Sequence, residues 1–144
     1  MTVIFACVHN AGRSQMAAAF FNAAADPARA RARSAGSEPA ARVHPAVVAV
    51  MREVGIDLAH AVPARLTPEL VAGADLLVTM GCGESCPAVP GLRRTDWALP
   101  DPKGQPLDQV RHIRDEIRAR VQRLIASERW TELPETSVAA PERR

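Results

Sequence analysis

A thiol and a guanidinium stand close together near the amino-terminal end of this sequence. Cys7 directly follows the apolar stretch Val3-Ile4-Phe5-Ala6, and Arg13 precedes a segment with the apolar spacing of a helix. Both belong to one continuous run, Cys7-Val8-His9-Asn10-Ala11-Gly12-Arg13-Ser14. This order predicts a strand, a short loop and the start of a helix, with the thiol at the beginning of the loop.

The predicted loop is suited to hold an oxyanion. Backbone N–H groups that point inward from such a loop, together with the unpaired N–H groups of the following helix, attract negative charge. The same field stabilises a thiolate, so we expect Cys7 to act as a nucleophile. The residues expected to bind the oxyanion are Val8, His9, Asn10, Ala11, Gly12, Arg13 and Ser14.

Several residues of the run have separate expected roles. Asn10 and Gly12 tolerate backbone conformations that other residues resist, which suits a tight cradle. Arg13 presents a planar fork that can bind two oxygens of the anion and neutralise charge that develops during a reaction. The hydroxyl of Ser14 can cap the helix or donate to the thiolate. The alternative interpretation makes Cys7 an inert buried cysteine and Arg13 a surface charge.

The other two cysteines follow a second predicted strand. The apolar run Asp75–Met80 is typical of a buried strand, and the segment Gly81-Cys82-Gly83-Glu84-Ser85-Cys86-Pro87 comes directly after it. If this strand is a parallel neighbour of the first, Cys82 and Cys86 lie at the edge of the sheet that holds Cys7. Three thiols at one edge are suited to successive disulfide exchange. Incidental small residues and a metal site are the alternatives.

Strand and helix signals alternate along the chain. We expect strands at residues 3–6, 29–35, 75–80 and 92–97, helices at residues 14–25, 45–54 and 107–125, and a short helix from Thr67. This alternation predicts a single-domain, three-layer α/β/α fold with a four-stranded parallel sheet. The domain is expected to span residues 1–130, and the composition of residues 131–144 predicts a frayed or disordered tail.

Composition limits the classes of function. The chain has 144 residues, of which 47% are hydrophobic and 24% charged, and this suits one globular domain. Its net charge of +2 comes from interleaved acidic and basic residues, so we expect no nucleic-acid partner. No segment has the pattern of a signal peptide or a membrane span, which favours a cytoplasmic protein without a membrane partner. In that reducing compartment, three cysteines are expected to be catalytic or metal-binding rather than structural.

Three segments together resemble one known family. They are the run from Cys7 to Ala17, the loop that ends in Cys86-Pro87, and the segment Asp96-Trp97-Ala98-Leu99-Pro100-Asp101-Pro102. In this order they resemble arsenate reductases of the low-molecular-weight tyrosine phosphatase fold, and the likeness runs over residues 2–127. The late cysteine pair is similar to that of the thioredoxin-coupled members. The resemblance therefore implies the fold of that family and reduction of arsenate to arsenite, as in arsenic detoxification.

The resemblance also implies a role for each catalytic residue. Cys7 would attack arsenate, Arg13 and the loop amides would hold its oxygens, and Asp101 would protonate the departing oxygen. Cys82 would then attack the adduct on Cys7, and Cys86 would attack Cys82, leaving a Cys82–Cys86 disulfide for thioredoxin to reduce. No bound cofactor is required, phosphate and sulfate are expected analogues of arsenate, and we expect a monomer. On its own, Asp101 before a proline is also typical of a turn.

Some features depart from the family pattern or leave alternatives open. Only Gly83-Glu84-Ser85 separates the late cysteines, and the segment Ala17-Ala18-Ala19 lacks the glutamate that helps some members hold potassium, so we expect no metal site. Glutaredoxin or a small thiol could replace thioredoxin as reductant. A protein tyrosine phosphatase is the second candidate, although the chain contains no tyrosine and Lys103-Gly104 follows Pro102. A module that senses arsenite or redox state through its cysteines is the third.

Overall fold

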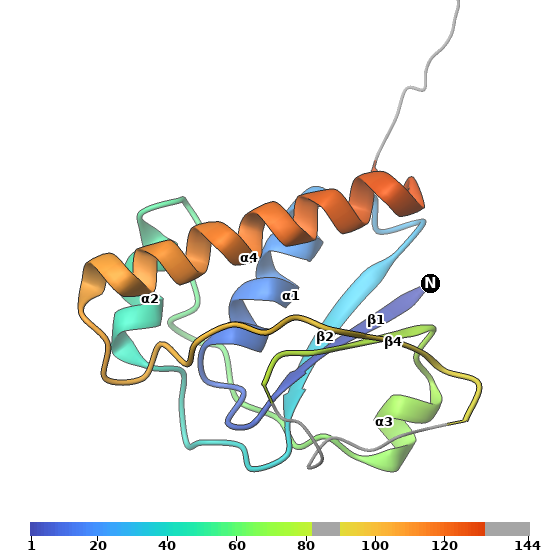
Figure 1. Ribbon diagram of the computed structural model, residues 1–144, viewed down its shortest axis with the longest axis horizontal. Helices are drawn as coiled ribbons and strands as arrows, with labels where there is room; N and C mark the ends of the chain where they lie inside the picture. Colours follow the sequence, from blue (N-terminus) through green and yellow to red (C-terminus); the bar gives the residue numbers. More distant parts are fainter. Residues whose placement is uncertain (82–89, 132–144) are drawn as a thin grey trace, which may run out of the picture.

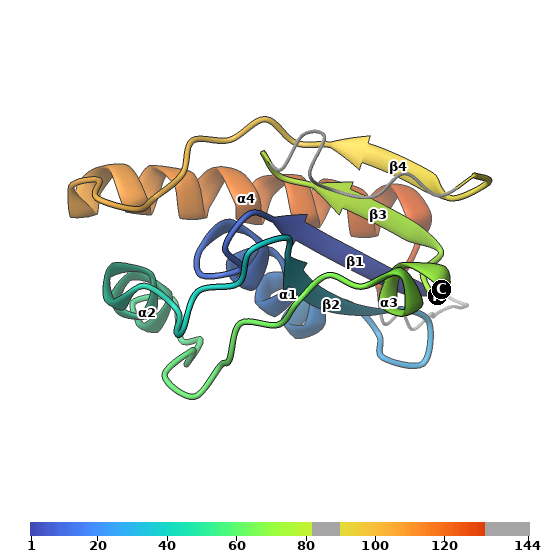
Figure 2. The same ribbon diagram turned by 90° about the horizontal axis from the view of Figure 1, so that it is seen from below.

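Four parallel strands form the centre of the molecule. The computed structural model describes residues 1–81 and 90–131. Its sheet has the order β2-β1-β3-β4, and every neighbouring pair is parallel (Figures 1 and 2). The strands are β1 (Thr2–Cys7), β2 (Arg31–Gly36), β3 (Leu76–Thr79) and β4 (Arg93–Asp96). The predicted four-stranded parallel sheet is confirmed, and β1 and β3 are the neighbours that the sequence argument required.

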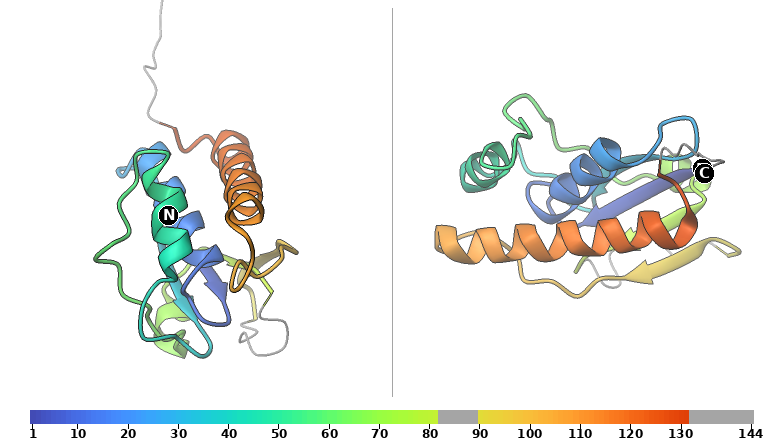
Figure 3. Two further views of the ribbon diagram at one scale, coloured as in Figure 1. Left: turned by 90° about the vertical axis from the view of Figure 1, so that its left-hand side faces the viewer. Right: turned by 90° about the horizontal axis from the view of Figure 1, so that it is seen from above.

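Helices cover both faces of this sheet. They are α1 (Arg13–Ala24), α2 (Pro45–Arg52), α3 (Pro68–Ala72) and α4 (Leu107–Glu128). Helices α1 and α4 lie on the same face and pack against each other, while α2 packs against α4 near the end where β1 finishes (Figure 3). On the other face, Val71 of α3 packs with Ile4 and Leu77. Within the described residues, no helix is both long and apolar enough to cross a membrane.

The ends of the helices follow from local sequence. Thr67 caps α3 by accepting a hydrogen bond from Leu70 N at 3.1 Å, and Pro68 supplies the first helical residue. Pro45 is likewise the first helical residue of α2, although this helix has no side-chain cap. Just beyond α2, Gly55 has φ of +83°, a left-handed conformation that glycine adopts without strain. The starts of α2 and α3 agree with the prediction, but α2 ends at Arg52 with Glu53 as its C-cap, rather than at Val54 with Gly55 as the cap.

Aromatic side chains tie the layers together at the centre of the core. The ring of Phe5 lies 6.0 Å from that of Phe21 and 5.6 Å from that of Trp97, between ring centroids. Phe21 in turn meets Trp130 at 5.8 Å, so the segment after α4 also joins the core. The next residue, Thr131, forms an isolated bridge with Ala25. The rest of the predicted tail lies outside the described residues.

Candidate active site

The run that begins at Cys7 forms a loop between the carboxyl end of β1 and the amino end of α1. Cys7 is the last residue of β1 and is buried, and Arg13 is the first residue of α1. Asn10 has φ of +51°, the left-handed conformation that asparagine adopts more readily than most residues. The predicted order of strand, loop and helix is therefore confirmed.

Carbonyl groups of the loop are bound on its outer side. Backbone N–H groups of the segment that follows β2 donate to the carbonyls of Cys7, Val8, His9 and Ala11, at distances of 2.8 to 3.2 Å. In a planar trans peptide the N–H points opposite to the carbonyl. The amides that follow these carbonyls therefore point to the inner side of the loop, as an oxyanion site requires.

Gly12 is explained by close packing. Its φ is −146°, which is outside the left-handed region. A Cβ at this position would lie 2.7 Å from Cγ of Pro102 and 3.6 Å from Cγ2 of Val47. The loop therefore needs a residue without a side chain here because the Asp101-Pro102 segment lies against it.

Ser14 is hydrogen-bonded to the thiol. Its Oγ lies 2.8 Å from Cys7 Sγ and also accepts a hydrogen bond from Asn10 Nδ2 at 2.7 Å. The alternative role of Ser14 as a helix cap is wrong, because α1 begins after Gly12 with no side-chain cap. A hydroxyl that donates to a thiolate stabilises the charged sulfur.

Two further side-chain contacts of the loop were missed by sequence reasoning. Asn10 Oδ1 accepts from Gln15 Nε2 at 3.1 Å and from the backbone N of Ala64 at 2.8 Å. Asn10 is completely buried, and Gln15 is 7% exposed. Their only signal in the sequence was polarity beside an expected catalytic cysteine, since Ala64 lies far along the chain.

Arg13 extends toward the predicted acid. Its Nη1 donates to the carbonyl of Leu99 at 3.1 Å, and its Nη2 lies 3.8 Å from Asp101 Oδ2. The Arg13 side chain is 8% exposed, whereas that of Asp101 is 44% exposed. Asp101 also accepts from Lys103 N at 3.0 Å, the local turn contact expected of an aspartate before proline.

Gly81 joins the second cysteine segment to this site. It follows β3, has φ of +94°, and a Cβ added to it would overlap Arg13 Nη1. The chain thus leaves β1 and β3 at the same edge and passes directly against the guanidinium. Cys82 and Cys86 lie outside the described residues.

Two histidines lie near the loop. Half-buried His9 places Nδ1 3.1 Å from the carbonyl of Glu38, in the outer segment that binds the loop carbonyls. His44 donates its backbone N–H to Ala11 O at 2.9 Å. Burial lowers the pKa of its side chain, and the Asp101 carboxylate opposes this effect only in part. His44 therefore favours its neutral form beside the loop.

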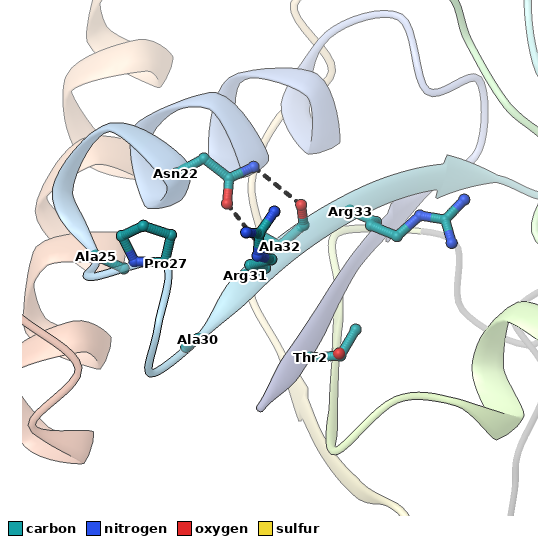
Figure 4. Close-up of a pocket in the computed structure, with 8 residues that line it drawn as sticks. All are labelled: Thr2, Asn22, Ala25, Pro27, Ala30, Arg31, Ala32 and Arg33. Atoms are coloured by element: carbon teal, nitrogen blue, oxygen red, sulfur yellow. Dashed lines mark hydrogen bonds between the residues drawn. The ribbon is translucent and has the colours of Figure 1, made fainter.

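One hollow of the described residues is remote from the Cys7 loop. It has a volume of about 520 Å³ and lies where the strands begin, opposite the end that holds Cys7 (Figure 4). At its wall, the Asn22 side chain accepts from Ala32 N and donates to Ala32 O, both at 2.9 Å. These bonds provide partners for the backbone N–H and carbonyl of Ala32 at the outer edge of β2. We therefore assign this hollow no part in the site.

Sequence comparisons place the chain among known proteins. The family described as low molecular weight phosphotyrosine protein phosphatase matches residues 2–136. A Halobacterium salinarum protein named "Putative arsenate reductase" is 41% identical over 125 residues, which are 81% of this chain and 85% of that protein. A Synechocystis protein named "Glutaredoxin arsenate reductase" is 35% identical over 127 residues, 86% of this chain and 95% of that protein.

Structural comparison agrees with these matches. A thioredoxin-dependent arsenate reductase of Corynebacterium glutamicum has a TM-score of 0.77 with 39% identity and covers 89% of this chain. The chain spans 61% of the length of that structure. Fold, motif and relatives together confirm the resemblance seen in the sequence: the chain belongs to the low molecular weight phosphotyrosine protein phosphatase family, among its members of the arsenate reductase type.

Proposed function

We propose that this protein reduces arsenate to arsenite with Cys7 as the nucleophile. The observation that carries the proposal is the contact of Cys7 Sγ with Ser14 Oγ at 2.8 Å, inside a loop that has four of its carbonyls bound on the outer side. The names of relatives that are 41% and 35% identical support arsenate as the oxyanion. Arsenate is a tetrahedral oxyanion, so the inward amides and the Arg13 guanidinium are suited to bind its oxygens.

In the first step, the Cys7 thiolate attacks arsenic and forms a sulfur–arsenic bond. One arsenate oxygen leaves as water after protonation, and Asp101 is the proposed donor because its carboxyl lies beside Arg13 and is open to solvent. Arg13 stabilises the charge on the remaining oxygens. Arsenic keeps its oxidation state of five in this step.

In the second step, the Cys82 thiolate attacks the Cys7 sulfur. The sulfur–arsenic bond breaks and its electron pair passes to arsenic, which leaves as arsenite in oxidation state three. A Cys7–Cys82 disulfide is formed. Cys86 then attacks Cys82 and releases the Cys7 thiolate, and the resulting Cys82–Cys86 disulfide accepts two electrons from an external dithiol.

We propose thioredoxin as that dithiol, with glutaredoxin as the alternative. The Corynebacterium glutamicum relative named as thioredoxin-dependent favours the first, and the Synechocystis relative named for glutaredoxin favours the second. The test is arsenate-dependent consumption of NADPH with each complete reducing system. Multiple turnovers with thioredoxin are expected, and Cys7→Ser should abolish them. An absence of arsenate-dependent consumption with both systems would contradict the proposed activity.

Hydrolysis of phosphate esters is the second candidate, favoured by the family itself and by the similar shape and charge of phosphate and arsenate. It requires only the nucleophile, the guanidinium and the acid. A tyrosine-directed phosphatase also needs an aromatic wall beside its substrate, and the chain contains no tyrosine. We therefore expect slow hydrolysis of a small aryl phosphate as a side activity. A higher kcat/KM for a phosphotyrosine peptide than for arsenate would reverse this order.

A further inference from the structure

A line of buried side-chain hydrogen bonds leads from helix α1 to the Cys7 sulfur. Gln15 Nε2 donates to Asn10 Oδ1 at 3.1 Å. Asn10 Nδ2 donates to Ser14 Oγ at 2.7 Å, and Ser14 Oγ lies 2.8 Å from Cys7 Sγ. All four residues are buried, and Gln15, the most exposed of them, is 7% exposed. Water therefore cannot easily replace a lost bond, and each member depends on the orientation of the previous one.

One backbone group fixes the orientation of both amides. Ala64 N donates to Asn10 Oδ1 at 2.8 Å, and a backbone N–H can only donate. The Asn10 atom that faces it must therefore be oxygen, which turns Nδ2 toward Ser14. The Gln15 atom that reaches the same oxygen must be its Nε2 for the same reason. The direction of these bonds thus follows from the main chain.

The Ser14 hydroxyl carries the orientation to the thiol. It has a single proton, and its oxygen already accepts from Asn10 Nδ2, so the proton is free to point at Cys7 Sγ. A thiolate can only accept a hydrogen bond, so this arrangement favours the reactive form of the nucleophile.

We propose that Gln15 is a positioning residue for Cys7. By donating to Asn10 Oδ1, Gln15 holds the amide that turns the Ser14 hydroxyl toward the sulfur. The proposal rests on Cys7 as the nucleophile, which is part of the proposed function. It does not depend on whether the bound oxyanion is reduced or hydrolysed.

The test reverses the polarity of the Gln15 contact. Gln15→Glu keeps the shape of the side chain but places a carboxylate oxygen against Asn10 Oδ1, which displaces or reverses the Asn10 amide. Alkylation of Cys7 by iodoacetamide is followed in the full chain by mass spectrometry of the peptide that carries Cys7. The alkylation rate of Gln15→Glu should be about tenfold lower than that of the protein with Gln15 at mildly acidic pH, and the two rates should be equal at alkaline pH. Gln122→Glu on the exposed surface of α4 adds the same charge and should keep the original profile.

A double-mutant cycle separates this role from a general structural effect. Ser14→Ala removes the last member of the line, so Gln15→Glu should have no further effect in that background. An unchanged pH profile in Gln15→Glu, or an equal effect in the absence of Ser14, would overturn the proposal. Gln15→Met removes the donor without adding charge and is measured in the same cycle, which covers the case where Gln15→Glu does not fold. Because alkylation requires no arsenate, failure of the proposed function would leave this result interpretable.

Discussion

The guanidinium of Arg13 is held by the main chain before any anion binds. One nitrogen donates to the Leu99 carbonyl and the other faces Asp101, while Gly81 lies against Nη1. Such an arrangement limits the number of conformations that the long side chain can adopt, so less entropy would be lost on binding the proposed oxyanion. It also requires the planar fork specifically, because a single ammonium cannot meet the carbonyl and the anion in the same way.

Arg13→Lys is therefore expected to lower kcat/KM for a small aryl phosphate by roughly 100-fold or more, although the charge is retained. Initial rates measured on the purified variant test this prediction. Arg33→Lys, an exposed exchange on β2 away from the loop, is the matched control and should keep the original rate. Equal rates for the two variants would show that Arg13 supplies charge alone.

His44 predicts a dependence of stability on pH. Burial lowers its pKa below 6.5; among its charged neighbours, Asp101 opposes this while Lys103 and His9 add to it. The folded state therefore binds the His44 proton more weakly than the unfolded state, so its contribution to the free energy of unfolding falls as pH drops below 6.5.

His44→Asn should remove this dependence. Urea unfolding at about pH 8 and about pH 5 gives the free energy of unfolding of the natural protein and of the variant. The difference between the two free energies should shift against the natural protein at the lower pH. Gln122→Asn, at an exposed position, removes no titratable group and should give the same difference at both pH values. A difference for His44→Asn that stays constant over this range would contradict the assignment.

At the scale of elements, the pairing of β1 with β3 brings two distant segments to one edge of the sheet. Ala6 pairs with Thr79, so the Cys7 loop and Gly81 leave the sheet side by side. Gly81 combines a left-handed backbone with close approach to Arg13. Both features exclude a side chain at Gly81, so its backbone packs directly against the Arg13 guanidinium.

Gly81→Ala should consequently displace Arg13 and reduce both arsenate turnover and aryl phosphate hydrolysis by at least about tenfold. Gly91→Ala is a suitable control, because its φ of +83° gives a similar backbone cost with open space around the added methyl group. If the two variants lose the same activity, the effect belongs to backbone strain in general. Steady-state rates together with thermal unfolding would separate the two cases.

The late cysteines are expected to be required for arsenate reduction but not for the hydrolysis of an aryl phosphate. Cys82→Ser and Cys86→Ser should each abolish multiple turnovers of arsenate reduction with thioredoxin, because neither can complete the proposed exchange of disulfides. Both should retain slow hydrolysis of an aryl phosphate, which needs only Cys7, Arg13 and the acid. Cys7→Ser should lose both activities. Undiminished arsenate turnover in either late variant would remove that cysteine from the mechanism.

Sequence patterns predicted the elements better than the contacts between them. The apolar runs of β1 and β3, the Pro45 start of α2 and the Thr67 cap are local signals, and the structure confirms them. The support of Asn10 by Ala64 joins residues that are 54 positions apart and depends on a loop without a sequence motif. Similarly, the need for Gly12 arises from Pro102, which only the folded chain brings against it.

At the scale of the whole molecule, an ion-pair cluster links α2 to α4. Buried Arg114 donates through Nη1 to Val50 O and to Glu53 Oε1, both at 2.8 Å, and Arg111 binds the same carboxylate. Hydrogen bonds from Arg111 and then from Arg114 lower the pKa of Glu53, so the carboxylate remains charged at neutral pH. The amino end of α2 in turn donates from His44 to the carbonyl of Ala11 in the Cys7 loop.

Arg114→Met should therefore destabilise α2 and, through His44, weaken the contact between α2 and the Cys7 loop. The substitution retains an apolar stem of similar length but leaves the Val50 carbonyl without its partner, and we expect the free energy of unfolding to fall by about 1–2 kcal/mol. Arg123→Met, on the exposed side of the same helix, should change it by less than about 0.5 kcal/mol.

Hydrogen exchange tests the link to the site: the amide of His44, which is bonded to Ala11, should exchange faster in Arg114→Met than in Arg123→Met. Equal protection of this amide in both variants would mean that the cluster stabilises the helices without supporting the loop.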